Sequence, residues 1–220
     1  MRPMNLRLAL SFALFLPIAS HAAGIGLRAG TTGLGGDIGW EVAPTLSARI
    51  GYSALSFKKN IDSNDVHYDG KVKLSNLSGL LDWGVLGPMR LTGGVILNDN
   101  RYDVNGQPSN GTFTLNGNTY QASQVGSVNG TVKSGRAVAP YLGIGYGNVA
   151  GKGVNFYFDL GVMFMGSPKA TLNASCGSGL SASQCSQLQN DTAEESRRLE
   201  DKLNRYKYYP VANVGVTIGF

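Results

Sequence analysis

The chain has 220 residues, among them 31 glycines and 10 tyrosines, but only 15% are charged, and the formal net charge is +5. Soluble domains carry about 25% charged residues and about 7% glycine, so this composition argues against an ordinary cytosolic enzyme. It fits an all-β protein whose outer surface does not face water. Beyond the N-terminal segment, no run of about 18 apolar residues predicts a membrane-spanning helix.

The first residues have the layout of a secretory signal peptide. Arg2 and Arg7 precede an apolar run over 8–18, and small residues follow this run. That run is about eleven residues long, short of the roughly 20 that span a bilayer as a helix, and a cleavage pattern lies at 20–23. We predict that 1–23 is removed and that 24–220 forms one domain, with an uncleaved anchor as the alternative. The mature chain keeps a net charge of +3, too small to indicate nucleic acid.

Along the mature chain, bulky apolar residues recur at every second position, as in "VNFYFDLGVMF" over 154–164. This period is the signature of a strand with two different faces. It predicts eight strands, near 24–32, 34–43, 45–58, 66–84, 89–104, 131–148, 154–171 and 206–220.

The connections between these strands are of two kinds. Short ones fall at 43–45, 85–88 and 149–153, and long polar ones at 58–66, 104–131 and 172–205. Short turns at one end and long loops at the other are typical of bacterial outer-membrane barrels, whereas a soluble sandwich would carry more Lys and Glu. The predicted fold is an all-β, eight-stranded antiparallel transmembrane β-barrel with short periplasmic turns and long extracellular loops, one of which carries a helix.

Local patterns add three expectations. The apolar parity of 66–84 switches, which predicts a bulge near Ser75–Asn76. Asn116–Gly117 predicts a tight hairpin inside the long loop. A mostly solvated helix is expected over 183–204, within the loop at about 172–205, with support from pairs at i, i+4 such as Glu194 with Arg198 and Asp201 with Arg205.

The stretch "APYLGIGYGNVAGKG" over 139–153 could be taken for a phosphate-binding loop. Only three residues separate Gly147 from Gly151, Gly153 stands where Ser or Thr is needed, and no helix pattern follows. We therefore interpret it as a strand with a bare inner face at Gly143, Gly145 and Gly147, followed by a tight turn at Lys152–Gly153.

The signal peptide, "GTTGLGGDIGWEVAPTLSARIGYSALSF", "APYLGIGYGN" with "GKGVNFYFDLGVMFMGSPK", and the final "VGVTIGF" together resemble small proteobacterial outer-membrane barrels of the type of outer-membrane proteins A and W. The resemblance covers the mature chain. It implies a monomer in the outer membrane with both termini periplasmic, surrounded by lipid and lipopolysaccharide. It also implies assembly by periplasmic chaperones and the barrel-assembly machinery, which would read the terminal strand at Val214, Val216, Ile218 and Phe220.

Charged residues of the strands fall on the face predicted to line the lumen: Arg28, Asp37, Glu41, Arg49, Asp82, Arg90 and Asp159. The interior of an eight-stranded barrel is only just wide enough for side chains, and an unpaired charge there is costly. Six of them, all but Asp37, are expected to form an ion-pair network. The network is interpreted as a plug, with an electrostatic gate or narrow polar path as the alternative.

Cys176 and Cys185 are the only cysteines of a secreted chain, which predicts a disulfide. No metal or cofactor site is predicted, because the only histidine of the mature chain is His67. Three functions remain open: a structural barrel or narrow pore for small solutes, a surface adhesin acting through the long loops, and a lipid A-modifying enzyme that uses His67. No catalytic pattern of neighbouring residues accompanies His67, so enzyme activity is not expected.

Overall fold

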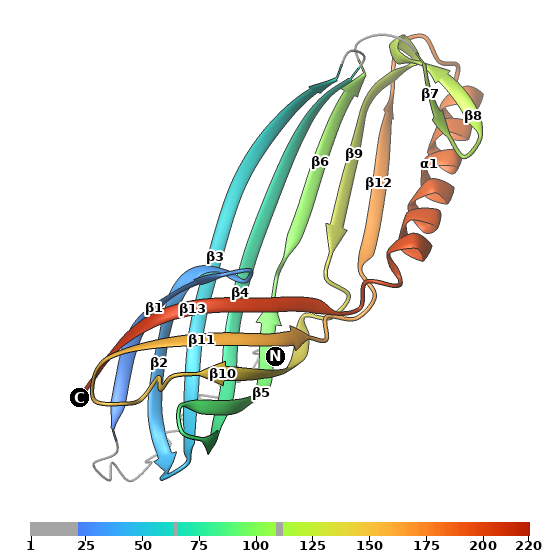
Figure 1. Ribbon diagram of the computed structural model, residues 1–220. Helices are drawn as coiled ribbons and strands as arrows, with labels where there is room; N and C mark the ends of the chain where they lie inside the picture. The colour runs from blue at the N-terminus through green and yellow to red at the C-terminus, as the bar shows by residue number, and fades with distance from the viewer. Residues whose placement is uncertain (1–21, 64–65, 109–111) are drawn as a thin grey trace, which may run out of the picture.

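The structure is a computed structural model and describes residues 22–63, 66–108 and 112–220. Eight strands form a closed antiparallel ring (Figure 1). They are β1 (Ala23–Gly30), β2 (Gly33–Ala43), β3 (Leu46–Ser63), β4 (Val66–Leu86), β5 (Met89–Asn98), β10 (Val138–Tyr146), β11 (Gly153–Met163) and β13 (Tyr209–Gly219). β4 pairs with β5 and β1 with β13, so every strand of the ring has two neighbours. The eight-stranded barrel predicted from the alternation is confirmed.

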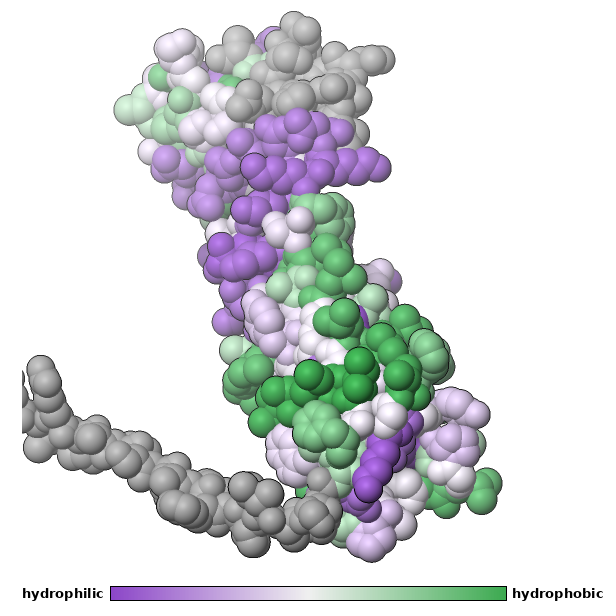
Figure 2. Space-filling view, turned by 90° about the vertical axis from the view of Figure 1, so that its left-hand side faces the viewer, coloured by the Kyte–Doolittle hydropathy of each residue, from purple (hydrophilic) through white to green (hydrophobic). Residues whose placement is uncertain are grey.

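The two faces of the ring differ as the alternation predicts. Outward side chains are apolar and exposed, for example Leu27 at 71% and Phe156 at 76%, whereas inward side chains of the same strands are buried. On the face that Figure 2 presents, hydrophobic surface covers the barrel strands, with hydrophilic surface above it. Such a band has the properties of a surface in contact with lipid.

Three of the predicted strands are divided in two, which corrects the sequence prediction. The strand predicted at 89–104 is β5 followed by β6 (Arg101–Pro108), that at 131–148 contains the end of β9 (Val125–Lys133) and β10, and that at 154–171 is β11 followed by β12 (Lys169–Cys176). Gly166, with a φ of +70°, and Pro168, which has no N–H to donate, mark the last of these breaks.

The parts of these strands that lie outside the ring, β6, β9 and β12, help to build a five-stranded sheet, which we call the wall. It contains the far parts of β3 (55–63) and β4 (66–74), followed in order by β6, β9 and β12. The wall rises from one side of the barrel (Figure 1). The described parts of the loops predicted at 58–66 and 104–131 are thus largely strands, because β3 and β4 continue beyond the ring and offer an edge for pairing. The loop predicted at 172–205 contains the end of β12 and the predicted helix.

The predicted bulge near Ser75–Asn76 is wrong. β3 and β4 keep one register from Leu46↔Trp83 to Ser63↔Val66. The apolar parity changes because the surroundings change: Leu77 lies outward on the barrel, whereas Leu74 is buried on the inner face and Lys73 is exposed on the outer face. On the barrel the outer face is apolar, whereas beyond it the outer face of the same strand is polar and the inner face is apolar.

Helix α1 (Ala182–Leu203) packs against β12, the last strand of the wall. It agrees within one residue with the helix predicted at 183–204 and begins with a capping box formed by Ser181 and Gln184. Ser196 Oγ accepts a hydrogen bond from the Leu172 N–H at 2.7 Å, and Glu200 accepts one from the Ala170 N–H at 3.1 Å. The helix therefore satisfies donors on an otherwise open strand edge.

Between β6 and β9 lies a small hairpin of β7 (Thr112–Leu115) and β8 (Asn118–Gln121), followed by a short 3₁₀ turn η1 (Ala122–Gln124). Asn116 and Gly117 form its turn with φ values of 50° and 84°, as a tight hairpin of this type requires. The predicted hairpin is confirmed. The predicted i, i+4 pairs of the helix are not seen among the described ion pairs, where Glu194 instead contacts Arg197 at 3.1 Å.

Candidate functional site

The barrel interior carries the densest set of charges in the described chain. Six of the eight ring strands each contribute one charged side chain to a common layer, which we call the lumen network: Arg28, Asp37, Arg49, Asp82, Arg90 and Asp159. All six are at most 5% exposed. The network has three guanidinium groups and three carboxylates, so its formal charge balances.

Arg49 is the centre of the network. Its Nη1 lies 2.7 Å from Asp159 Oδ2, and its Nε lies 3.1 Å from Asp82 Oδ2. A planar guanidinium presents five donors in a fixed fork, which is why one arginine can bind two carboxylates from different strands. Arg49 thus bridges β3 to β4 beside it and to β11, which is not its neighbour in the ring.

Arg90 shares both carboxylates with Arg49. Its Nε lies 3.2 Å from Asp82 and its Nη2 2.5 Å from Asp159. Its Nη1 donates to the carbonyl of Gly147, where the turn between β10 and β11 begins. Thr92 completes the cluster by donating to Asp82 at 2.6 Å. Thr92 was not predicted to join the network, because only charged residues were considered, although the period of two puts Thr92 on the inner face.

A second part of the network lies around Tyr157. Arg28 Nη1 is 3.0 Å from Asp37 Oδ1, and the Tyr157 hydroxyl donates to the other oxygen of Asp37. The guanidinium carbons of Arg49 and Arg90 lie 5.4 and 5.5 Å from the centre of the Tyr157 ring. The ring therefore separates the two parts and contacts cations on its face.

Glycines make room for these large side chains. A Cβ on Gly145 would lie 2.6 Å from the Arg90 guanidinium, and one on Gly215 would lie 2.2 Å from the Tyr157 ring. Gly143 faces Tyr141 in the same way, at 2.4 Å from its hydroxyl. The bare inner face of 139–147 is thus a packing surface in the structure.

Glu41 departs from the expectation that it joins the ion pairs. It is only partly buried, and it forms no ion pair with another described residue. It lines a cavity of about 340 Å³ at the short-turn end, and Asp82 and Arg90 of the network also line this cavity. Asp37, left out of the expected six, holds Arg28 instead. The parity rule gave the correct face for both acids but could not tell their depths apart.

Side chains pack against the lumen network on both sides, although the short-turn side also borders the cavity of about 340 Å³. On the short-turn side, Val149 and Ala150, each 2% exposed, fold into the barrel, where the Val149 side chain lies against Gly39. On the wall side, an apolar cluster packs inside the barrel: Leu80, Ile96, Ala139, Tyr141, Met163 and Val211. A cavity of about 10 Å³ remains between this cluster and the network, room for about one water. A short turn at 149–153 was predicted, but its insertion into the barrel was not, since no local pattern marks a turn that folds inward.

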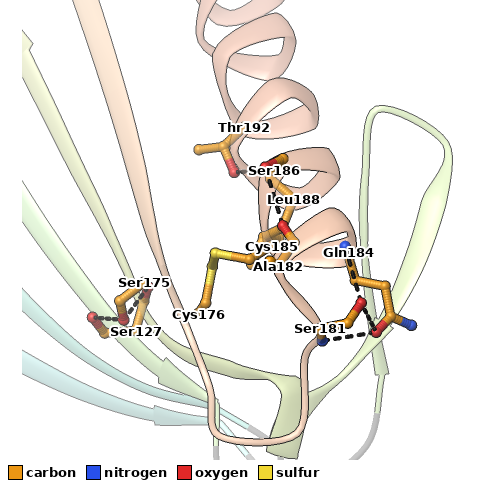
Figure 3. Close-up of a disulfide and its surroundings, with 10 residues drawn as sticks. All are labelled: Ser127, Ser175, Cys176, Ser181, Ala182, Gln184, Cys185, Ser186, Leu188 and Thr192. Atoms are coloured by element: carbon orange, nitrogen blue, oxygen red, sulfur yellow. Dashed lines mark hydrogen bonds between the residues drawn. A yellow bond between two sulfur atoms is a disulfide. The ribbon is translucent and has the colours of Figure 1, made fainter.

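Cys176 and Cys185 form the predicted disulfide, which joins the end of β12 to the first turn of α1 (Figure 3). Beside it, Leu188 is fully buried with Leu115, Tyr120 and Val125 in a small core between helix, hairpin and wall. The disulfide therefore fixes the helix on the wall and lies far from the lumen.

A buried carboxylate ties the hairpin to the helix. Asp191 of α1 accepts hydrogen bonds from Tyr120 at 2.5 Å, Asn118 at 2.7 Å, and Asn116 and Gln187 at 3.1 Å each. These bonds, first that of Tyr120, hold the pKa of Asp191 below its usual range. Burial and the same bond raise the pKa of Tyr120 to about 12.

Other expected sites are placed as follows. Val214, Ile218 and Phe220 lie outward and exposed at the end of β13, and Val216 lies outward and half-buried; their role in assembly stays a prediction. The backbone of His67 pairs with Gln107 in the wall, and its side chain lies outside the described residues. Among the described residues no cluster of three or more His, Cys, Asp or Glu could hold a metal ion. None of the described helices has the length and apolar character needed to cross a bilayer.

These features define a class: the chain has the fold of a small eight-stranded outer-membrane β-barrel. The chain is similar in structure to CarO of Acinetobacter baumannii, with a TM-score of 0.60 and 24% identity over 90% of this chain and 97% of that one. CarO2 of the same species gives a TM-score of 0.60 at 22% identity, over 90% and 98%. No family model matches the sequence, and neither does any curated protein sequence.

Proposed function

We propose that the chain is an integral protein of the bacterial outer membrane, inserted after removal of 1–23, with both termini in the periplasm and the wall outside the cell. The exposed apolar band of the ring supports insertion into lipid. Gly24, the first residue left after removal of 1–23, pairs with Gly219 at the end that carries the short turns, which in barrels of this type is the periplasmic end. Assembly through the outward residues of β13 and a monomeric state belong to the same proposal.

Within the membrane, the barrel acts as a sealed anchor that holds the wall at the cell surface. The single observation that carries this is the lumen network. It crosses the bore from six strands with its charges paired, and an apolar cluster fills part of the interior on its wall side. The solute-passing alternative would require a continuous polar path, and the described interior offers only a space of about one water between the network and the apolar cluster.

The test is conductance and stability measured on the same samples. The folded wild type in a planar bilayer should give no steady single-channel current. Arg49→Ala leaves Asp82 and Asp159 short of a partner, and breaking a buried pair costs roughly 3–5 kcal/mol. Arg49→Ala should therefore lower the urea midpoint of unfolding, or admit water and give a current. Glu41→Gln is the matched control, since Glu41 faces inward and forms no ion pair with another described residue, and should change neither readout.

A steady current through the wild-type protein would contradict the sealed anchor and support the narrow-pore alternative. If Arg49→Ala left the urea midpoint unchanged and gave no current, the network would not be what holds the bore closed.

A second candidate, recognition of a surface partner, is favoured by the wall. Its inner face exposes Phe57, Tyr102 and Val104 at 39–49% on the part that α1 does not cover. Exposed aromatic residues are enriched in binding surfaces. Replacing Phe57 and Tyr102 by Ser should abolish adhesion of expressing cells to a host surface or ligand if the wall is a binding surface, whereas the sealed anchor alone predicts no change.

A further inference from the structure

The outer face of the wall carries four cationic residues in one row, directly above the barrel. Lys73 of β4 pairs with Arg101 of β6, Arg101 with Lys133 of β9, and Lys133 with Lys169 of β12. Directly opposed residues of antiparallel strands lie on the same face, with Cβ atoms about 4.5–5.5 Å apart. We call Lys73, Arg101, Lys133 and Lys169 the basic row.

The basic row lacks enough acid to balance it. Asp99 lies 3.3 Å from Lys73, an exposed pair, and no other member of the row forms an ion pair with a described residue. Asp103, one row further out, is opposed by Lys71 and accepts a hydrogen bond from Thr131 at 2.8 Å. Like charges directly opposite one another destabilise a sheet. An anion from outside the chain would remove that cost.

The position of the row indicates which anion it meets. The last apolar row of the band runs in register below it, through Tyr52, Leu77, Leu97 and Val138, all 42–55% exposed. From Leu77 to Lys73 is four residues along β4, or about 13 Å at roughly 3.3 Å per residue. Strand tilt shortens this height, so the basic row lies at the level where lipid hydrocarbon gives way to headgroups.

We propose that the basic row binds the phosphate groups of glycolipid headgroups in the outer leaflet. The proposal rests on the proposed function for the location of the wall. Lys73, Lys133 and Lys169 are exposed and Arg101 is half-buried, so all four can present donors outward. Strands about 4.8 Å apart place the four cations over roughly 14 Å, a span that suits a headgroup with more than one phosphate better than a single free ion.

The experiment uses the mature protein refolded in a neutral detergent. Three probes are used: bisphosphorylated lipid A, dephosphorylated lipid A at the same lipid concentration, and inorganic phosphate at the same phosphate concentration as the first probe. Bisphosphorylated lipid A should bind and raise the Tm of the wild type, and the other two should not. Each cation near a lipid surface contributes about 1 kcal/mol, so replacing all four row residues by Gln should weaken binding at least tenfold.

The control variant removes four exposed cations elsewhere, by Gln at Lys59, Lys152, Arg198 and Lys202, and should bind like the wild type. Without glycolipid and at low salt, the row variant should be as stable as the wild type or more so, because the repulsion within the row is gone. A heat-modifiability gel verifies that each variant is folded.

Equal lipid A binding by the row variant would overturn the inference, as would an equal response to dephosphorylated lipid A or to inorganic phosphate. Failure of the proposed function has different signatures, namely a current through the wild type or a wall that faces the periplasm. Labelling Lys133→Cys on intact cells reports the side on which the wall lies, independently of lipid binding.

Discussion

At the scale of single residues, packing in the lumen depends on pairs in which a large side chain lies against a glycine. The Tyr157 ring lies against Gly215 and the Arg90 guanidinium against Gly145. The two large groups contact each other as well, with the Arg90 guanidinium over the Tyr157 ring. Crowding and charge pairing are therefore two aspects of one packed layer.

Gly215→Ala should destabilise the barrel, because the new Cβ would lie 2.2 Å from the Tyr157 ring and force it away from Asp37. Overpacking of this kind typically costs about 1–3 kcal/mol. The urea midpoint of unfolding in detergent measures it. Gly79→Ala, at a site with no atom within 4 Å, is the matched control and should be close to neutral. Equal midpoints for the two variants would mean that the Tyr157 layer relaxes freely.

At the scale of elements, the wall is held together at its far edge by α1. The helix contributes side-chain acceptors to the edge of β12, a disulfide to its end and a buried carboxylate to the hairpin. These attachments are local in space and independent of the ring. The helix region should therefore unfold separately from the barrel.

Replacing Cys176 and Cys185 by Ser should loosen α1 and leave the barrel intact. Closing a loop of about ten residues contributes roughly 2–3 kcal/mol through the entropy of the open chain. Hydrogen exchange of the α1 amides should become faster, while the shift between boiled and unboiled samples on a gel stays the same. The unreduced wild type should yield no alkylatable thiol, and two labelled thiols would contradict the disulfide.

The contact between hairpin and helix should weaken in acid. The pKa of Asp191 is lower in the folded chain than its ordinary value of about 3.9. Its contribution to stability is thus fully present above that value and is lost as the pH falls through the folded pKa. Side-chain amide signals of Asn118 in an NMR titration should report the loss. Asp191→Asn should remove the pH dependence, and persistence of the transition in that variant would assign it to another group.

At the scale of the whole molecule, a closed ring and an open sheet share two continuous strands. β3 and β4 pass from lipid into water without a change of register, so the wall and the barrel form one body along their length. A ring of this kind has no free edge, which gives such barrels their resistance to unfolding.

Purified protein should therefore migrate differently on a gel before and after boiling, and its circular dichroism should be dominated by β-sheet. Recovery from cells should be in the outer-membrane fraction. A chain found in the soluble fraction with no mobility shift would contradict the membrane barrel. A signal-peptide variant that retains residues 1–23 provides the control for export.

The amino-acid sequence by itself determined the ring and the identity of its inner face. A period of two needs no knowledge of distant contacts, so the eight barrel strands and the inward orientation of Arg49 and Asp159 could be predicted from it, and the Asn116–Gly117 turn from its dipeptide. The disulfide followed from the count of two cysteines in a secreted chain. Depth along the lumen, by contrast, follows from the stagger between strands. This is why Glu41 was expected to join the ion pairs and Asp37 was left out.

Only the tertiary structure decided that the long loops form a wall. Pairing of β6, β9 and β12 depends on the edge that β4 offers beyond the ring, and no local pattern specifies which strand supplies an edge. The basic row has the same origin, because Lys73, Arg101, Lys133 and Lys169 are distant in sequence and become neighbours only through the registers of three strand pairs. Local periodicity fixes the face on which a side chain lies, whereas its neighbours depend on register, which the whole fold sets.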